Sequence, residues 1–150
     1  MWHRDRAEFQ AFAGEKCSIQ GTGMQVVDGN VHMMRNAHEP NNGMGLSLDP
    51  EMLVTGSNSG FQALNFAVLA GAKTVLLLGY DAREPSTGKP SHWFGEHPEV
   101  APIAAFADYR RSCTAAAVLI KAAGVRVLNC SPGSAIDCFE RMDLDQALRL

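Results

Sequence analysis

A loop of glycine and small polar residues, at positions 57–60, directly precedes a predicted helix. It reads Ser57, Asn58, Ser59, Gly60. Backbone N–H groups at a helix N-terminus bind anions, and hydroxyl and amide side chains add donors, so the loop could hold a phosphate. The alternative is a plain N-cap, which needs only one such residue. The loop lacks both the Gly-Lys-Ser/Thr ending of a Walker loop and the G-x-G-x-x-G fingerprint, so a dinucleotide is not indicated.

A second candidate group follows the apolar run at residues 75–78, where the sequence continues as Gly79, Tyr80 and Asp81. Ligands of open α/β sheets bind at the carboxyl ends of the strands. Asp81 could contact a ribose hydroxyl, hold a metal or orient a histidine. The alternative is a loop aspartate that caps the next turn.

A third group, Asn129, Ser131 and Ser134, follows the next predicted strand and could line the same crevice. A turn with an N-cap explains these residues equally well. Cys130, between them, fits a core residue better than a nucleophile.

The long polar loop at residues 81–100 contains His92 and His97. Loops of this length are usually lids or binding loops, and histidine is the usual general acid or base near neutral pH. Both histidines are therefore catalytic candidates, together with Asp81. Two alternatives stay open: a surface loop that packs its aromatic residues on the core, and a zinc site of both histidines with Asp81 or Glu96.

Apolar periodicity, glycines and capping residues predict the elements that would position these groups. We expect helices at residues 4–13, 59–70 and 102–123, a short one from Ala135 and a last one from Leu144. Strands are expected at residues 16–20, 24–27, 31–34, 75–78 and 125–128, and a surface loop at residues 36–50. The helix at 59–70 should be largely buried, with Gln62 and Asn65 as a solvated stripe or facing the ligand.

This order of elements predicts an α/β fold: a single three-layer Rossmann-like domain with a mostly parallel sheet. The run at 75–78 should be a central strand, while Arg126 places the strand at 125–128 nearer an edge. A doubly wound half normally opens with a strand, but this chain begins with a predicted helix. We therefore expect a sheet that either lacks its first strand or is small.

The composition narrows the class of protein. The 150 residues carry a net charge of −3 with no basic stripe, which argues against nucleic-acid binding. No apolar run approaches the ~20 residues of a membrane span, and the N-terminus lacks a signal-peptide pattern, so we expect a cytoplasmic protein. The four cysteines have no C-x-x-C spacing and are expected to be reduced thiols, with a zinc cluster as the minor alternative.

Three stretches of the sequence carry a family resemblance: residues 58–65, the turn at 71–73 and the strand end at 77–81. Together with the stretches at 92–98 and 129–136, they resemble a group of small phage and prophage proteins. More remotely, they are similar to the family 42 sialyltransferases and to proteins related to 6-hydroxymethylpterin diphosphokinase and motility accessory factors.

This resemblance implies a Rossmann-like nucleotide-binding core. Ser59, Gly60, Gly79, Tyr80 and Asp81 would then hold the CMP part of a sugar donor. A histidine beyond the strand, His92 or His97, would act as the base.

Two functions from different classes follow. The first is a nucleotide- or nucleotide-sugar-binding domain, with transferase activity as one expectation. The second is a non-enzymatic phage accessory protein that uses the fold for binding or assembly. The expected partner is a small phosphorylated ligand or nucleotide. No motif in the sequence requires a cofactor, and Mg²⁺ is the one candidate. Under either function, an open sheet edge predicts a homo-oligomer.

Overall fold

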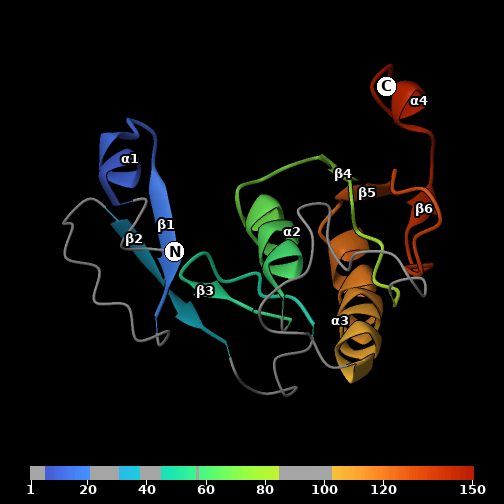
Figure 1. Cartoon of the computed structure of the whole chain (residues 1–150), viewed down its shortest axis with the longest axis horizontal. Helices are drawn as coiled ribbons and strands as arrows, with labels where there is room; N and C mark the ends of the chain where they lie inside the picture. Colours follow the sequence, from blue (N-terminus) through green and yellow to red (C-terminus); the bar gives the residue numbers. More distant parts are fainter. Residues whose placement is uncertain (1–5, 21–30, 38–44, 57, 85–102) are drawn as a thin grey trace.

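The structure is a computed structural model that describes residues 6–20, 31–37, 45–56, 58–84 and 103–150. These residues form a mixed α/β fold with two small parallel sheets (Figure 1). The N-terminal sheet has the order β1-β2-β3 and follows helix α1 (Arg6–Ala11). Its strands are β1 (Lys16–Ile19), β2 (Val31–Asn36) and β3 (Met52–Leu53). The first helix and the strands predicted at 16–20 and 31–34 are thus confirmed, while the strand predicted at 24–27 lies outside the described residues.

The C-terminal sheet has the order β4-β5-β6, again with parallel pairs. Its strands are β4 (Thr74–Leu77), β5 (Arg126–Asn129) and β6 (Glu140–Arg141). The 20-residue helix α3 (Ile103–Ala122) lies between β4 and β5 in the chain, as predicted. No helix in the described ranges is long and apolar enough to cross a membrane.

The predicted places of β4 and β5 in the sheet are wrong. β5 lies in the middle, and β4 lies at an edge of the sheet that the described residues form. Arg126 does not mark an edge, because its guanidinium reaches across to the neighbouring strand β6 and pairs with Glu140 at 2.9 Å. A charged residue in a short strand can therefore be satisfied by a cross-strand partner.

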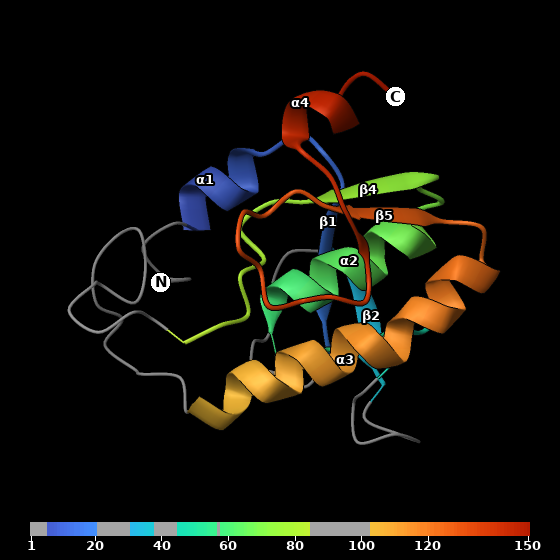
Figure 2. The same ribbon diagram turned by 90° about the vertical axis from the view of Figure 1, so that its right-hand side faces the viewer.

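Both faces of the C-terminal sheet are covered. Leu77 and Val127 point to one face and belong to the main core with side chains of α2 and α3. Leu76 and Leu128 point to the other face, where they pack near Ala147 of α4 (Leu144–Ala147). Figure 2 shows α2 and α3 on one side of β4 and β5, with α4 on the other. The uninterrupted apolar run of β4 follows from this double coverage.

Helix α2 (Ser59–Leu69) begins and ends as its sequence predicts. Asn58 is the N-cap, and the chain leaves the helix through Gly71, which has a φ of 82°. The N–H groups of Gly71 and Ala72 return to the carbonyls of Val68 and Ala67, the hydrogen-bond pattern of a Schellman motif. Its buried residues are Phe61, Leu64, Asn65 and Val68, which lie on one face, while Phe66 is 40% exposed, so the prediction that the helix is largely buried is wrong.

The prediction of a surface loop at residues 36–50 is wrong for residues 36–37 and 45–47, while residues 38–44 lie outside the described residues. Strand β2 continues to Asn36, and Ala37, Leu46 and Ser47 are buried. Strand β3, which was not predicted, follows soon after. The backbone of Ser47 is buried against α2, where its N–H and carbonyl bond the side chain of Asn65, and such a polar contact leaves no apolar periodicity in the sequence.

The short helix expected from Ala135 does not form. Its backbone groups are taken by side chains instead: the N–H of Ile136 donates to Ser134 Oγ, and its carbonyl accepts from Asn129 Nδ2. The chain continues into β6, which the sequence did not predict. The final helix, predicted from Leu144, is confirmed as α4.

Candidate functional site

The end of β4 and the start of α2 lie against each other at Tyr80 and Gly60. The Tyr80 hydroxyl donates a 2.7 Å hydrogen bond to the Gly60 carbonyl oxygen. A Cβ placed on Gly60 would lie 3.1 Å from Tyr80 Cε1, so glycine allows this close approach. Burial, and to a lesser extent the Cys113 thiol, raises the pKa of Tyr80. The hydroxyl therefore stays protonated and acts as a donor.

Asn58 acts as the N-cap that the alternative reading described. Its Oδ1 accepts from the N–H of Phe61 at 2.8 Å, and its Nδ2 donates to the carbonyl of Gly56 at 3.1 Å. The N–H groups of Ser59 and Gly60 make no hydrogen bond within the part of the chain that is described, and the Ser59 side chain is exposed. The anion-binding capacity of this helix start thus lies in two backbone N–H groups. Ser57 lies outside the described residues.

The backbone of Tyr80 is fixed by two serines that follow β5. Its N–H donates to Ser131 Oγ at 2.8 Å, and its carbonyl accepts from Ser134 Oγ at 2.6 Å. Ser131 Oγ also donates to the carbonyl of Leu77 at 3.2 Å. The loops after β4 and β5 are therefore joined, as the common-crevice hypothesis requires.

Asn129, Ser131 and Ser134 are all buried, at 2%, 5% and 4% exposure. Asn129 Nδ2 donates to the carbonyl of Ile136, and Asn129 Oδ1 accepts from the N–H of Ser131. Their side chains make these hydrogen bonds inside the chain and support the end of the sheet. Among the candidate residues that the structure describes, Ser59, Gly79 and Asp81 are exposed.

Asp81 lies on the loop after β4. Its carbonyl accepts from the N–H of Ala135 at 2.7 Å, which ties the two loops together again. Its carboxylate is exposed and makes no hydrogen bond or ion pair with the described residues. His92, His97 and Glu96 lie outside the described residues. Within the described ranges, no three His, Cys, Asp or Glu side chains are grouped to hold a metal ion.

Sequence reasoning missed the structural role of Asn65, which it placed on a solvated stripe or facing the ligand. Asn65 is fully buried, and its Oδ1 accepts from the N–H groups of Ser47 and Val54 at 3.2 and 3.0 Å. Its Nδ2 donates to the carbonyl of Ser47 at 2.9 Å. An asparagine among apolar helix positions was the only available signal, and its partners are distant in sequence.

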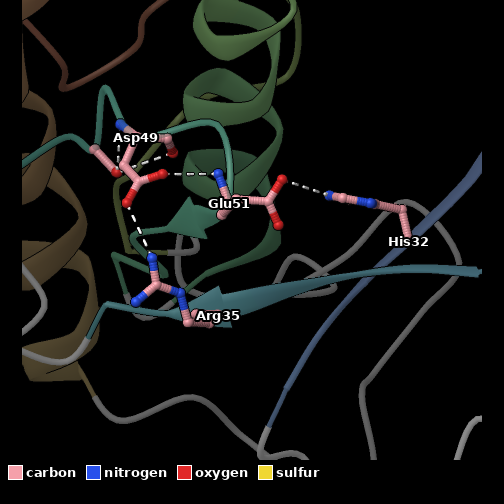
Figure 3. A network of polar contacts seen from close by, with 5 residues as sticks. His32, Arg35, Asp49 and Glu51 are labelled. Carbon is pink, nitrogen blue, oxygen red and sulfur yellow. Dashed lines mark hydrogen bonds and ion pairs between the residues drawn. The ribbon is translucent and has the colours of Figure 1, made fainter.

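A second polar cluster lies on the N-terminal sheet, away from this site. In Figure 3, Arg35 on β2 pairs with Asp49 at 3.0 Å, and His32 lies 3.9 Å from Glu51. Asp49 Oδ1 also accepts from the N–H of Glu51 at 2.9 Å. These side chains are largely exposed, so each ion pair contributes little to stability. The cluster holds the turn before β3 against β2.

The four cysteines are free thiols in different surroundings. Cys17 is exposed, Cys113 and Cys130 are buried, and Cys138 is intermediate. Burial, with a smaller contribution from Cys138, raises the pKa of Cys113 to about 12. Cys113 is therefore a core residue and a poor nucleophile.

Comparisons of the chain with protein-family models, curated proteins and solved structures gave no match.

Proposed function

We propose that this chain is a nucleotide- or nucleotide-sugar-binding domain with a three-layer Rossmann-like fold and a transferase activity of the sialyltransferase or pterin diphosphokinase-like kind. One observation carries the proposal: the Tyr80–Gly60 hydrogen bond, which joins the carboxyl end of a parallel strand to the N-terminus of a helix. Parallel sheets with helices bind phosphorylated ligands at such junctions.

The proposed roles follow from the hydrogen-bonding and acid–base groups that each residue could offer to a ligand. The N–H groups of Ser59 and Gly60 bind a phosphate. The Asp81 carboxylate contacts the ribose hydroxyls or orients a histidine. His92 or His97 carries the proton, and replacement of the catalytic histidine by alanine should then lower the rate about a hundredfold or more.

The direct test is a thermal-shift panel of the whole chain. It comprises CMP, UMP, AMP and GMP, their diphosphates and sugar derivatives, and a pterin, each with and without Mg²⁺. A ligand present at about 100 times its dissociation constant stabilises the folded state by about 2.7 kcal/mol. One selective hit supports the proposal, and a flat panel with a folded sample contradicts it.

A matched pair of variants at Ser59 locates the site. Ser59→Pro removes one backbone N–H at the first helical position, where proline is tolerated, and Asn58 before it is already extended, with φ −155° and ψ 153°. Ser59→Ala keeps that N–H. If the helix start binds phosphate, the proline variant should fold normally and lose about tenfold in affinity, since a charge-assisted hydrogen bond contributes about 1.5–3 kcal/mol. Equal affinity in both variants would exclude this backbone site.

A non-enzymatic accessory role is the second candidate, and the buried polar network favours it. Asn58, Asn129 and Ser131 are satisfied by hydrogen bonds within the chain, so their presence needs no ligand. The edge position of β4 could then pair with a second copy of the chain. Sedimentation at high concentration tests this homo-oligomer, and a strictly monomeric profile contradicts it.

A further inference from the structure

Three arginine guanidinium groups contact the loops that follow β4 and β5. Nη1 of Arg110, on α3, donates to the carbonyl of Ala82 at 2.7 Å. Arg83 lies over Gly133, where an added Cβ would be 2.9 Å from Nη1. Nη2 of Arg141, the last residue of β6, donates to the carbonyl of Ser134.

These contacts lie on two loops that are joined to each other. Ala82 and Arg83 are neighbours in the first loop, and Gly133 and Ser134 are neighbours in the second. The two loops are joined by the bonds from Ser134 Oγ to Tyr80 and from Ala135 to Asp81, at 2.6 and 2.7 Å. All three cationic groups therefore contact the loops at the carboxyl edge of the C-terminal sheet.

Within the described residues, these three arginines differ from three others in having no acidic partner. Arg35, Arg111 and Arg126 each pair with a carboxylate. Arg83, Arg110 and Arg141 form no ion pair in the portion of the chain that the structure describes. Three carboxylates share these loops or follow them in the chain, and all are exposed: Asp81, Glu84 and Asp137. Arg110 and Arg141 each donate one hydrogen bond to a backbone carbonyl, and Arg83 lies against Gly133 without one to the described chain, so each guanidinium group has further N–H donors that could bind an anion.

We propose that Arg83, Arg110 and Arg141 bind a second anionic group of the ligand, which makes the ligand a diphosphate or a diphosphate ester rather than a monophosphate. The inference rests on the proposed function, in which the start of α2 binds the first phosphate. Tyr80 separates the two anion sites: its hydroxyl contacts Gly60, and its backbone is bonded to the loop that carries Ser134. A ligand that spans Tyr80 needs two linked anionic groups.

Calorimetric titration with inorganic pyrophosphate and inorganic phosphate tests this assignment. We expect pyrophosphate to bind more tightly than phosphate. Arg83→Gln and Arg141→Gln should each weaken pyrophosphate binding about tenfold, as expected for the loss of a charge-assisted hydrogen bond. Arg83 donates no hydrogen bond to the described chain, so its variant should unfold at the same temperature as the parent. Arg149→Gln, an exposed arginine near the C-terminus, is the charge-matched control.

The outcomes separate the two proposals. Loss of affinity in the two loop variants but not in Arg149→Gln supports the arginine site. The arginine site is overturned by any of three results: equal loss of affinity in all three variants, no pyrophosphate binding, or equal affinity for phosphate and pyrophosphate. In each case, a hit among the nucleoside monophosphates would still support the nucleotide function. Arginine-dependent pyrophosphate binding with a flat nucleotide panel contradicts the nucleotide function alone.

Discussion

The Tyr80 hydroxyl donates to the carbonyl oxygen of Gly60, 20 residues earlier in the chain, at 2.7 Å. Tyr80 is also held through its N–H by Ser131 and through its carbonyl by Ser134. One residue therefore joins the first turn of α2, the end of β4 and the loop after β5. The proposed ligand site depends on this junction.

Removal of the Tyr80 hydroxyl should loosen the junction. We expect Tyr80→Phe to lower the free energy of unfolding by about 1 kcal/mol, since a typical hydrogen bond contributes that much. For a domain of this size, the midpoint of thermal unfolding should fall by about 2–4 °C. Tyr109→Phe is the control, because the described structure shows a ring contact with Phe106 but no hydrogen bond for its hydroxyl. Equal midpoints for the two variants would contradict the role of the hydroxyl.

Alanine at Gly60 should destabilise the chain, although alanine normally favours helices over glycine. The new Cβ would lie 3.1 Å from both Asn58 Oδ1 and Tyr80 Cε1. Tyr80 cannot shift easily because three hydrogen bonds hold it, so we expect a loss of about 1–3 kcal/mol, as for an overpacked site. Urea unfolding measures the loss, and Ser59→Ala at the exposed neighbouring position should stay within about 0.5 kcal/mol of the parent. A more stable Gly60→Ala variant would refute the close packing.

Asn65→Ala should be the most damaging single change among these variants. It removes three hydrogen bonds and leaves buried backbone groups of Ser47 and Val54 without a partner. Unsatisfied buried groups cost about 1–3 kcal/mol each, so we expect a total loss of about 3 kcal/mol or more. Gln62→Ala on the same helix serves as the control and should have a small effect. Similar urea midpoints for both variants would mean that Asn65 is not a structural anchor.

The stability of the chain should decrease in alkaline solution. Burial raises the pKa of Cys113 to about 12, against an ordinary value of 9.0, so the folded chain keeps this proton to higher pH than the unfolded chain. Between these two pH values the folded state binds more protons, and its stability falls as the pH rises, by at most about 1.4 kcal/mol per pH unit. The raised pKa of Tyr80 acts in the same direction at higher pH.

Urea unfolding from pH 8 to 10.5, in the presence of a reductant, measures this dependence. The curve of Cys113→Ala should fall less steeply than that of the parent. Parallel curves for the two proteins would show that Cys113 does not cause the loss.

The sequence predicts the elements with strong local signals well. Helix α2 has a capping asparagine and a terminal glycine at Gly71, and the structure uses both. Strands β4 and β5 are short apolar runs bounded by glycine-containing turns, and both are found within one residue of their predicted bounds. Local patterns suffice here because the caps and turns are formed by residues close in the chain.

The failures concern contacts between distant residues. Strand β3 and the burial of Ser47 depend on Asn65, 18 residues later. The central position of β5 depends on its backbone pairing with β6 as well as with β4, and β6 begins only at Glu140, 14 residues after Arg126. The grouping of the candidate site was predicted in part, since Gly60, Tyr80 and Ser131 do come together. The sequence alone does not show that Asn58, Asn129 and Ser131 form hydrogen bonds within the chain. Their partners can be identified only from the three-dimensional structure.

Asn65 couples local unfolding beside β3 to helix α2. Helix α2 packs in the main core with β4 and β5, yet its Asn65 side chain holds the backbone beside β3. Local exposure of the Ser47 and Val54 amides to solvent therefore requires both hydrogen bonds to a fully buried side chain of α2 to break. Hydrogen exchange at these two amides should be as slow as that of the α2 backbone itself, so that the short strand β3 belongs to the same cooperative unit as the helix.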